Sequence, residues 1–408
     1  MPRSRYTLLI PTFNRPAYLR SLIGYLAARR FEYPVRVLDT SSDDALAQNR
    51  ETVARAGLGI VHEVYDPATA IYKKLELAIA PVESTYCSFC ADDDILFTDQ
   101  VPKLLDVLDA NPTFDVAHGY YVNFKPGEDF DIWSTVYSAP SIASDDALKR
   151  IVQQMKDYQA IFYGVHRTQT MKSILAPLDR VKSLWAKEML TSSLTLIAGG
   201  AYRVPHYYMA RNTNPSIATE GWHPYQFFAV EPAELFREYA EYRAVTLEYL
   251  RADAHCRSAY EPQQLERVFD LVHLKYLTPM LKSQVMDLLI DQDMASRQIV
   301  NEAWKVSTAP TGGRGARLAA LLDPRFAIKV LKYLRRLARL YGALRSQSKF
   351  DVTLDRSLSK ITVRTAVRNG QNRRYVLSRD LVIQDFADGG YLTTSHLRDI
   401  IQHFDDYV

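Results

Sequence analysis

The chain has 408 residues, of which 47% are hydrophobic and 24% are charged, and its formal net charge is +3. This length and composition suit a globular protein with two or three folding units and exclude a chain that is disordered throughout. No apolar run reaches the roughly 18 residues that cross a bilayer, and the N-terminal stretch lacks the apolar core of an export signal. The charge is too small to imply nucleic acid. We therefore expect a cytoplasmic protein with no nucleic-acid partner.

Three cysteines are too few for a disulfide framework and indicate a reducing compartment. Cys87 and Cys90 form a C-x-x-C sequence inside an apolar run typical of a strand. Residues three apart on a strand point to opposite faces, so these two thiols are not expected to bind one metal ion. The sequence has no second C-x-x-C to complete a zinc site.

The first 125 residues alternate between short apolar runs typical of strands and amphipathic runs typical of helices. The expected strands are 6–10, 35–39, 60–64, 85–90 and 116–124. The expected helices are one after Asn14, which we expect to cap it, and 43–56, 69–80 and 101–108. This alternation predicts an α/β fold with a Rossmann-like, mostly parallel sheet and helices on both faces. Ligands bind such sheets at the carboxyl ends of the strands.

The rest of the chain divides by composition. Residues 145–155 and 185–197 are expected to be helices and 161–166 a strand, which extends a first domain to 1–225. A largely helical, tyrosine-rich region is expected over 226–306, and a linker over 307–317. A basic amphipathic helix over 318–350 and a small mixed segment of strands and one helix over 351–408 would follow.

Common catalytic motifs are absent from the sequence: it has no Gly-rich phosphate loop, no dinucleotide fingerprint, and no zinc-protease or serine-hydrolase signature. Instead, Asp92, Asp93 and Asp94 follow the fourth expected strand. Three adjacent carboxylates repel one another unless a cation lies among them. Mg²⁺ and Mn²⁺ commonly bind one or two carboxylates together with substrate phosphates. The alternative is a solvated turn whose aspartates cap the next helix.

Three segments occur in the order LLIPTFNRPAYL, VRVLDTSS and TYCSFCADDDIL. In this order they resemble the nucleotide-sugar-binding half of family 2 glycosyltransferases, which have the GT-A fold and a D-x-D type motif. The resemblance covers roughly residues 5–125 and weakens towards 225. It implies a metal-dependent, inverting transfer of a sugar from a nucleotide diphosphate sugar, expected to be a UDP-sugar. The acceptor would be a hydroxyl of a glycan, a lipid-linked molecule or a protein, as in bacterial polysaccharide biosynthesis.

The same resemblance implies roles for individual residues. Asp94 and Asp92 would bind Mn²⁺ or Mg²⁺. Residues expected at the donor are Pro11, Thr12, Phe13, Arg15, Asp39, Lys73, Asp92, Asp93 and Arg211. Lys74 competes with Lys73 for the basic position, Arg15 would reach phosphate or the carboxylates, and Arg211 would bind diphosphate or form a salt bridge. Thr40-Ser41-Ser42 stands where many relatives have D-G-S, which leaves the nucleotide base open.

The general base is expected in the middle of the chain, and Glu188 is our choice, with Asp179 and Glu220 as rivals. The alternative for Glu188 is an exposed carboxylate paired with a nearby lysine. His118 and His166 lie in apolar runs and are expected in the core. Core packing is also the default for three aromatic residues that could stack on a sugar, namely Trp185, Trp222 and Tyr120.

Residues 324–350 contain eight Lys or Arg residues and no Asp or Glu. With its apolar stripe, this helix suits peripheral contact with an anionic membrane surface, on the inner face of the membrane. The alternative is a helix that packs on the protein through its apolar face. Two other functions remain open at this stage: a sugar nucleotidyltransferase, and a non-catalytic scaffold that binds membranes or glycans.

Overall fold

The computed structural model describes residues 5–125, 129–137, 139–213, 232–292, 351–355, 360–366 and 372–378, and six single residues between 334 and 345. Glu220, Trp222 and the linker over 307–317 lie outside the described residues, and so does most of the basic helix. The membrane prediction for 324–350 therefore stays a prediction. Across the described residues, no helix combines the length and the apolar character needed to cross a membrane.

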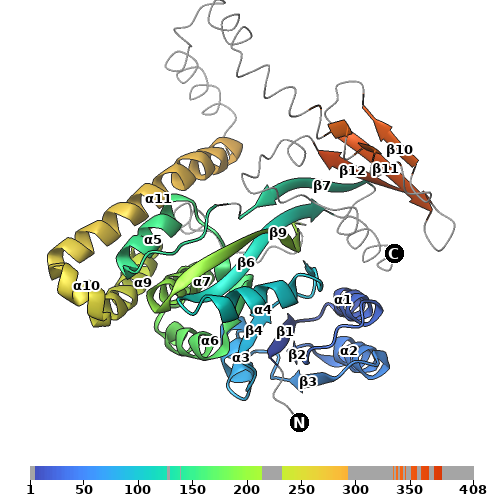
Figure 1. Ribbon diagram of the computed structural model, residues 1–408, viewed down its shortest axis with the longest axis horizontal. Helices are drawn as coiled ribbons and strands as arrows, with labels where there is room; N and C mark the ends of the chain where they lie inside the picture. The colour runs from blue at the N-terminus through green and yellow to red at the C-terminus, as the bar shows by residue number, and fades with distance from the viewer. Residues whose placement is uncertain are drawn as a thin grey trace, which may run out of the picture.

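The N-terminal part confirms the expected α/β fold (Figure 1). Four parallel strands lie in the order β3-β2-β1-β4. Their bounds are β1 Tyr6–Thr12, β2 Val35–Asp39, β3 Ile60–Val64 and β4 Tyr86–Phe89. The helices between them are α1 Pro16–Ala28, α2 Asp43–Arg55 and α3 Ile71–Ile79. The central strands β1 and β4 are buried on both faces, which is why they read as continuous apolar runs.

The other part of the sheet is mixed. Its strands are β5 Ile95–Leu96, β6 Phe114–Lys125, β7 Asp129–Val136, β8 Val165–Arg167 and β9 Gly200–Asn212. Strand β8 lies between β4 and β6 and is antiparallel to both, whereas β9 runs parallel to β6 and antiparallel to β5. Three later strands extend the sheet beyond β7, namely β10 Asp351–Leu354, β11 Lys360–Ala366 and β12 Asn372–Ser378. Short strands were expected in this segment, and the final helix expected near 395–404 lies outside the described residues.

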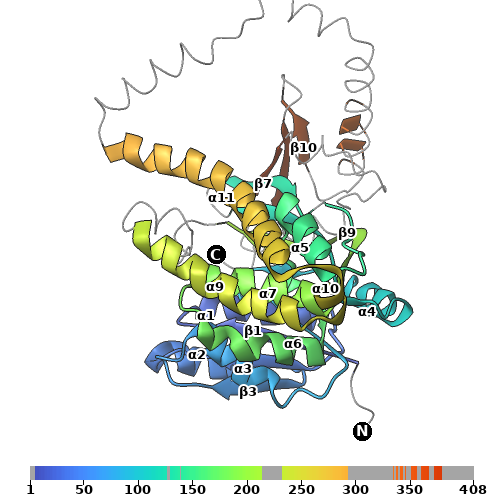
Figure 2. The same cartoon turned by 90° about the vertical axis from the view of Figure 1, so that its left-hand side faces the viewer.

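Two apolar cores lie on opposite faces of the sheet. Helices α1 and α4 (Val101–Ala110) cover one face. The other face is covered by α3 and by α5 Ala147–Lys156, α6 Thr168–Leu175, α7 Leu184–Ala198, α9 Pro232–Ala252 and α11 Pro262–Gln292 (Figure 2). The short helix α10, Ala254–Ala259, joins α9 to α11. Cys87 packs in one core and Cys90 in the other, and both thiols are free, which agrees with opposite-facing side chains on a strand.

Three local predictions need correction. Arg15, not Asn14, occupies the N-cap of α1, because Asn14 has a left-handed backbone (φ 53°) and its side chain accepts a hydrogen bond from the Ser42 amide. The strand expected over 161–166 is a 3-10 helix, Ile161–Tyr163, followed by β8. Strand β9 was not predicted, because a glycine pair and mixed polar residues obscure its alternation.

Candidate active site

The site begins where β1, β2 and β4 end side by side. Thr12 closes β1, and its hydroxyl donates a 2.6 Å hydrogen bond to Asp92, just beyond β4. The Thr12 carbonyl accepts hydrogen bonds from the backbone amide of Thr40 (3.2 Å) and from the Lys74 ammonium group (3.0 Å). Parallel strands place their carboxyl ends at one edge of the sheet. The three motifs noticed in the sequence therefore meet in space.

The basic residue at this edge is Lys74, whereas Lys73, the residue that we named for the donor, does not face the strand ends in this structure. Lys74 is 2% exposed and also donates to the Thr40 hydroxyl (2.9 Å). Lys73 faces away, because adjacent helical positions lie about 100° apart, and it pairs with Glu76 (2.7 Å) and Asp179 (3.5 Å). Asp179 is therefore an exposed partner of Lys73, away from the strand ends, and is a poor candidate for the base.

Replacing Lys74 with methionine should lower the free energy of unfolding by about 1–3 kcal/mol, because its hydrogen-bond partners are buried and Asp39 and Asp92 would lose a nearby cation. Lys73→Met is the matched control, with an expected change within about 0.5 kcal/mol. Urea unfolding at pH 7 measures both. Equal effects of the two substitutions would contradict the assignment of Lys74 to the site.

Asp39 ends β2 with no exposed side-chain surface. One carboxylate oxygen accepts from the Ser41 amide (2.7 Å), and the other from Asn49 Nδ2 (2.9 Å) and His62 Nε2 (2.9 Å). Burial alone would raise the pKa of Asp39, but these hydrogen bonds outweigh it and hold the pKa below its usual value. The predicted direct contact with the donor therefore needs correction: here the Asp39 carboxylate fixes the loop after β2.

Arg15 joins the acidic triplet. Its guanidinium lies 2.5 Å from Asp92 Oδ1 and 3.3 Å from Asp93 Oδ2. Of the two roles considered for Arg15, the structure therefore shows the carboxylate network. Beside it in sequence, the Phe13 side chain is 51% exposed and Pro11 is half-buried. An exposed aromatic ring and a partly exposed arginine thus stand next to a buried acidic cluster.

Burial disfavours the negatively charged forms of the three aspartates. Burial raises the pKa of Asp92 to about 7, although Arg15 opposes the shift. Burial and the charge of Asp93 raise the pKa of Asp94 to about 8, against the effect of Arg211 and of the Asn212 amide, which donates a 2.9 Å hydrogen bond to Asp94. The turn is not the solvated cap that we considered as the alternative, since all three residues are buried.

A divalent cation fits this cluster in part. Asp92 Oδ1 is buried and is held by the ion pair with Arg15, and Asp94 would gain its charged form beside a cation. Within the described part of the chain, no three His, Cys, Asp or Glu side chains come together as a complete metal site. Mg²⁺ and Mn²⁺ often complete their coordination with substrate phosphates and water. The cluster thus suits an ion that arrives with a diphosphate.

Glu188 and Arg211 interact electrostatically with each other. Burial raises the pKa of Glu188 to about 7, opposed by Arg211 and by the Tyr158 hydroxyl, which donates a 3.1 Å hydrogen bond. The guanidinium of Arg211 donates to the Tyr137 hydroxyl (2.9 Å) and interacts electrostatically with both Asp94 and Glu188. One arginine therefore influences the charge of both the acidic triplet and a separate carboxylate on α7.

Sequence reasoning missed several of these neighbours. Tyr137 has a left-handed backbone (φ 62°), which is strained for a tyrosine and common at functional sites. Such a conformation leaves no trace in a single sequence. Tyr158 is one of 26 tyrosines, and no local pattern distinguishes it. Asn212 follows Arg211 directly, but its part in holding Asp94 depends on the unpredicted strand β9.

The remaining candidate site residues described by the structure lie in the core, as we expected from the sequence. Burial lowers the pKa of both His118 and His166 to about 4, and their ring nitrogens contact backbone carbonyls. Trp185 is 4% exposed and packs near Tyr242, and Tyr120 is fully buried against Tyr207. None of these four side chains is available to stack on a sugar.

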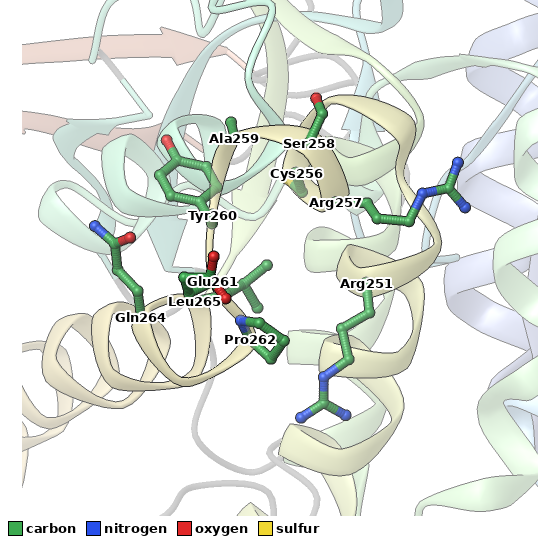
Figure 3. A pocket seen from close by; sticks show the side chains of 10 residues that line it. All are labelled: Arg251, Cys256, Arg257, Ser258, Ala259, Tyr260, Glu261, Pro262, Gln264 and Leu265. Atoms are coloured by element: carbon green, nitrogen blue, oxygen red, sulfur yellow. The ribbon is translucent and has the colours of Figure 1, made fainter.

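A separate cavity of about 350 Å³ lies where α9, α10 and α11 meet (Figure 3). It is lined by Cys256, Tyr260 and two arginines, Arg251 and Arg257, whose guanidinium groups point apart. Arg251 is already paired with Glu266. None of the residues at the strand ends lines this cavity, and its arginines do not converge on one point, so we place the chemistry at the acidic triplet.

Comparison with known proteins finds one family model that matches part of the chain and several similar structures. Residues 7–144 match the sequence model of the family described as Glycosyl transferase family 2. No curated protein sequence matches the chain. A crystal structure of S. aureus TarS residues 1–349 is similar with a TM-score of 0.46 and 15% identity, and the match covers 90% of this chain and 98% of that one.

Two further structures are similar. TarS 1–349 in complex with UDP-GlcNAc has a TM-score of 0.44 at 15% identity, covering 70% of this chain and 80% of that one. A mannosyltransferase from Pyrobaculum calidifontis in complex with GDP-Man and Mn²⁺ has a TM-score of 0.42 at 11% identity, covering 75% and 81%.

Proposed function

We propose that this chain catalyses a metal-dependent, inverting sugar transfer, on the premise that residues 7–144 match the sequence model described as Glycosyl transferase family 2. The donor would be a nucleotide diphosphate sugar and the acceptor a hydroxyl group. The observation that carries the proposal is the buried Asp92–Asp94 cluster together with a separate, half-buried carboxylate, Glu188, both under the electrostatic influence of Arg211. One group of carboxylates suits a cation and diphosphate, and the separate carboxylate suits a general base.

The donor would lie over the ends of β1 and β4. Phe13 offers an exposed ring for the nucleotide base, and Arg15 holds Asp92 and Asp93 in place. Thr12 fixes Asp92 from the other side. Asp39 and Lys74 are positioning residues beneath this surface, because their polar groups are buried and bonded to the loops themselves. Arg211 acts electrostatically on both Asp94 and Glu188, and it would face the diphosphate.

Asp94, with Asp92 behind it, would hold Mn²⁺ or Mg²⁺ together with the diphosphate oxygens. When bound, such an ion stabilises the negative charge that develops on the leaving diphosphate. Asp94 is the stronger ligand candidate of the two, because Asp92 already accepts from Thr12 and pairs with Arg15. The residues of the chain supply the rest: a fixed orientation for the donor, and an environment with little water.

Glu188 would accept the proton of the acceptor hydroxyl. With its pKa near 7, this carboxylate is basic enough to take a proton and still largely ionised above neutral pH. Attack from the side opposite the leaving group inverts the anomeric centre, which is the outcome that a base placed away from the diphosphate supports. The Tyr158 hydrogen bond orients the carboxylate for this role.

The proposal is tested by thermal unfolding with nucleotides and MnCl₂. A glycosyltransferase should be stabilised by UDP or GDP at least as strongly as by UTP or GTP, since binding to the folded state raises its unfolding temperature. A clear preference for triphosphates would favour a nucleotidyltransferase instead. No stabilisation by any nucleotide would indicate the non-catalytic scaffold.

A further inference from the structure

Five half-buried tyrosines lie within electrostatic range of Glu188, and they come from widely separated parts of the chain. The charge of Glu188 acts on every one of them: Tyr72, Tyr137, Tyr158, Tyr163 and Tyr276. Tyr72 lies on α3 and Tyr276 on α11, while the others lie in or near loops. Four of the five, Tyr72, Tyr158, Tyr163 and Tyr276, are half-buried residues at the edge of one apolar core.

Two of these tyrosines form a pair directly at the carboxylate. The Tyr158 hydroxyl donates to Glu188 Oε1 (3.1 Å) and lies 3.3 Å from the Ser192 hydroxyl. The rings of Tyr158 and Tyr276 have centroids 5.4 Å apart at an angle of 40°. A ligand bound against these two rings would therefore be separated from the Glu188 carboxylate, our proposed base, only by the Tyr158 hydroxyl.

The position of Tyr276 is fixed by buried hydrogen bonds. One turn before it on α11, His273 Nε2 lies 2.7 Å from the Tyr242 hydroxyl, which lies 2.8 Å from the Ser193 hydroxyl. Ser193 belongs to α7, the helix that carries Glu188. Helix α11 also packs against α5 and α9 (Figure 2). The chain of hydrogen bonds thus ties Tyr276 to the same helix as the carboxylate.

The charge around Glu188 indicates what this surface can bind. Among the described residues, Arg211 is the one charged side chain that affects the pKa of Glu188, and it also interacts with Asp94. In the described part of the chain, no second cation is thus close enough to Glu188 to change its pKa. Tyrosine rings offer apolar faces for the C–H groups of a sugar ring, and their hydroxyls can exchange hydrogen bonds with sugar hydroxyls.

We infer that Tyr158 and Tyr276 form an acceptor subsite for a neutral carbohydrate, with one sugar hydroxyl directed at Glu188. This inference rests on the proposed function. In the transfer, the acceptor oxygen forms a bond to the anomeric carbon, the bond from that carbon to the diphosphate breaks, and its electron pair leaves with the diphosphate. The acceptor proton passes to Glu188. Helix α11 lies well beyond residues 7–144, so the helical region would supply acceptor recognition to the family domain.

Saturation-transfer NMR on the full chain tests the subsite, with UDP and MnCl₂ present. The probes are neutral tetrasaccharides of glucose, mannose and N-acetylglucosamine, with an isoprenyl phosphate and a Ser/Thr-rich peptide as comparison arms. At least one tetrasaccharide should receive saturation, and Tyr276→Ala should reduce that signal by about fivefold or more. Tyr202→Ala is the matched control, because Tyr202 is half-buried against Phe114 and is not among the tyrosines around Glu188.

UDP affinity and thermal unfolding of each variant accompany the NMR. Tyr276→Ala should keep both the fold and the affinity for UDP while losing the tetrasaccharide signal. The inference is overturned if no tetrasaccharide receives saturation, if only the isoprenyl phosphate or the peptide does, or if Tyr276→Ala and Tyr202→Ala behave alike. Failure of the wild-type protein to bind any nucleotide would contradict the proposed function itself, which separates the two failures.

Discussion

Replacing Asp94 with asparagine should lower metal-dependent donor turnover about 10³-fold, equivalent to roughly 4 kcal/mol of transition-state stabilisation. The amide has nearly the same shape, and its oxygen can still accept the hydrogen bond from the Asn212 amide. The substitution removes only the negative charge of the carboxylate that we propose as a ligand of the cation. Release of nucleoside diphosphate with MnCl₂ present measures the loss. Turnover within tenfold of the wild type would reject Asp94 as the ligand.

The same substitution should stabilise the metal-free protein at pH 8. Folding raises the pKa of Asp94 from 3.8 to about 8, so the unfolded chain releases the proton of Asp94 at lower pH than the folded chain. Stability from this group is complete below pH 4 and falls as the pH rises towards 8. Asparagine does not ionise, so Asp94→Asn should be more stable by at least about 1 kcal/mol at pH 8. Urea unfolding in EDTA at pH 4 and pH 8 measures the difference, which should be larger at pH 8.

Replacing Glu188 with glutamine should reduce sugar transfer by about 10²–10⁴-fold, the usual contribution of a general base. Affinity for UDP should remain within a factor of two or three, because Glu188 lies on α7 and is not among the residues bonded to the acidic triplet. The comparison of transfer rate with nucleotide affinity distinguishes a base from a residue that only supports the fold. Near-normal transfer by Glu188→Gln would move the base elsewhere.

The pH dependence gives a second measurement on Glu188. Its pKa is raised to about 7, and a base acts only in its ionised form. Transfer by the wild-type protein should therefore fall about tenfold for each pH unit below 7 and level off above it. The residual transfer of Glu188→Gln should lack this dependence. A wild-type profile that is flat between pH 5.5 and 7 would contradict the assignment.

The sequence could predict most of the N-terminal architecture because apolar residues recur there with the spacing typical of a strand or of a helix. Strands β2 and β3 have the expected bounds, since apolar runs between turn signals leave little freedom in register. Strand β9 could not be predicted, because its pairing with β6 depends on contacts between residues about 85 apart. Glycine at 119 is part of that pairing, since a Cβ there would lie 2.2 Å from the His206 carbonyl oxygen.

The candidate site was predictable where it follows the strand ends, and not where it depends on long-range packing. Thr12 and Asp92 follow from motif order, and the structure joins them by a hydrogen bond. The sequence alone did not distinguish Lys73 from Lys74. Only the orientation of α3 about its own axis places Lys74 inward. Tyr276 is brought beside Tyr158 by a helix more than a hundred residues later, which no local pattern indicates.

The most direct test of the account is the calorimetric affinity for the nucleoside diphosphate that stabilises the protein best, measured in MnCl₂ and in EDTA. In the proposed site, buried acidic side chains and a diphosphate bind the cation together. Wild-type affinity should therefore be at least tenfold higher with Mn²⁺, and Asp94→Asn should lose that difference while keeping the weaker affinity in EDTA. Equal wild-type affinity in both buffers would contradict the central claim.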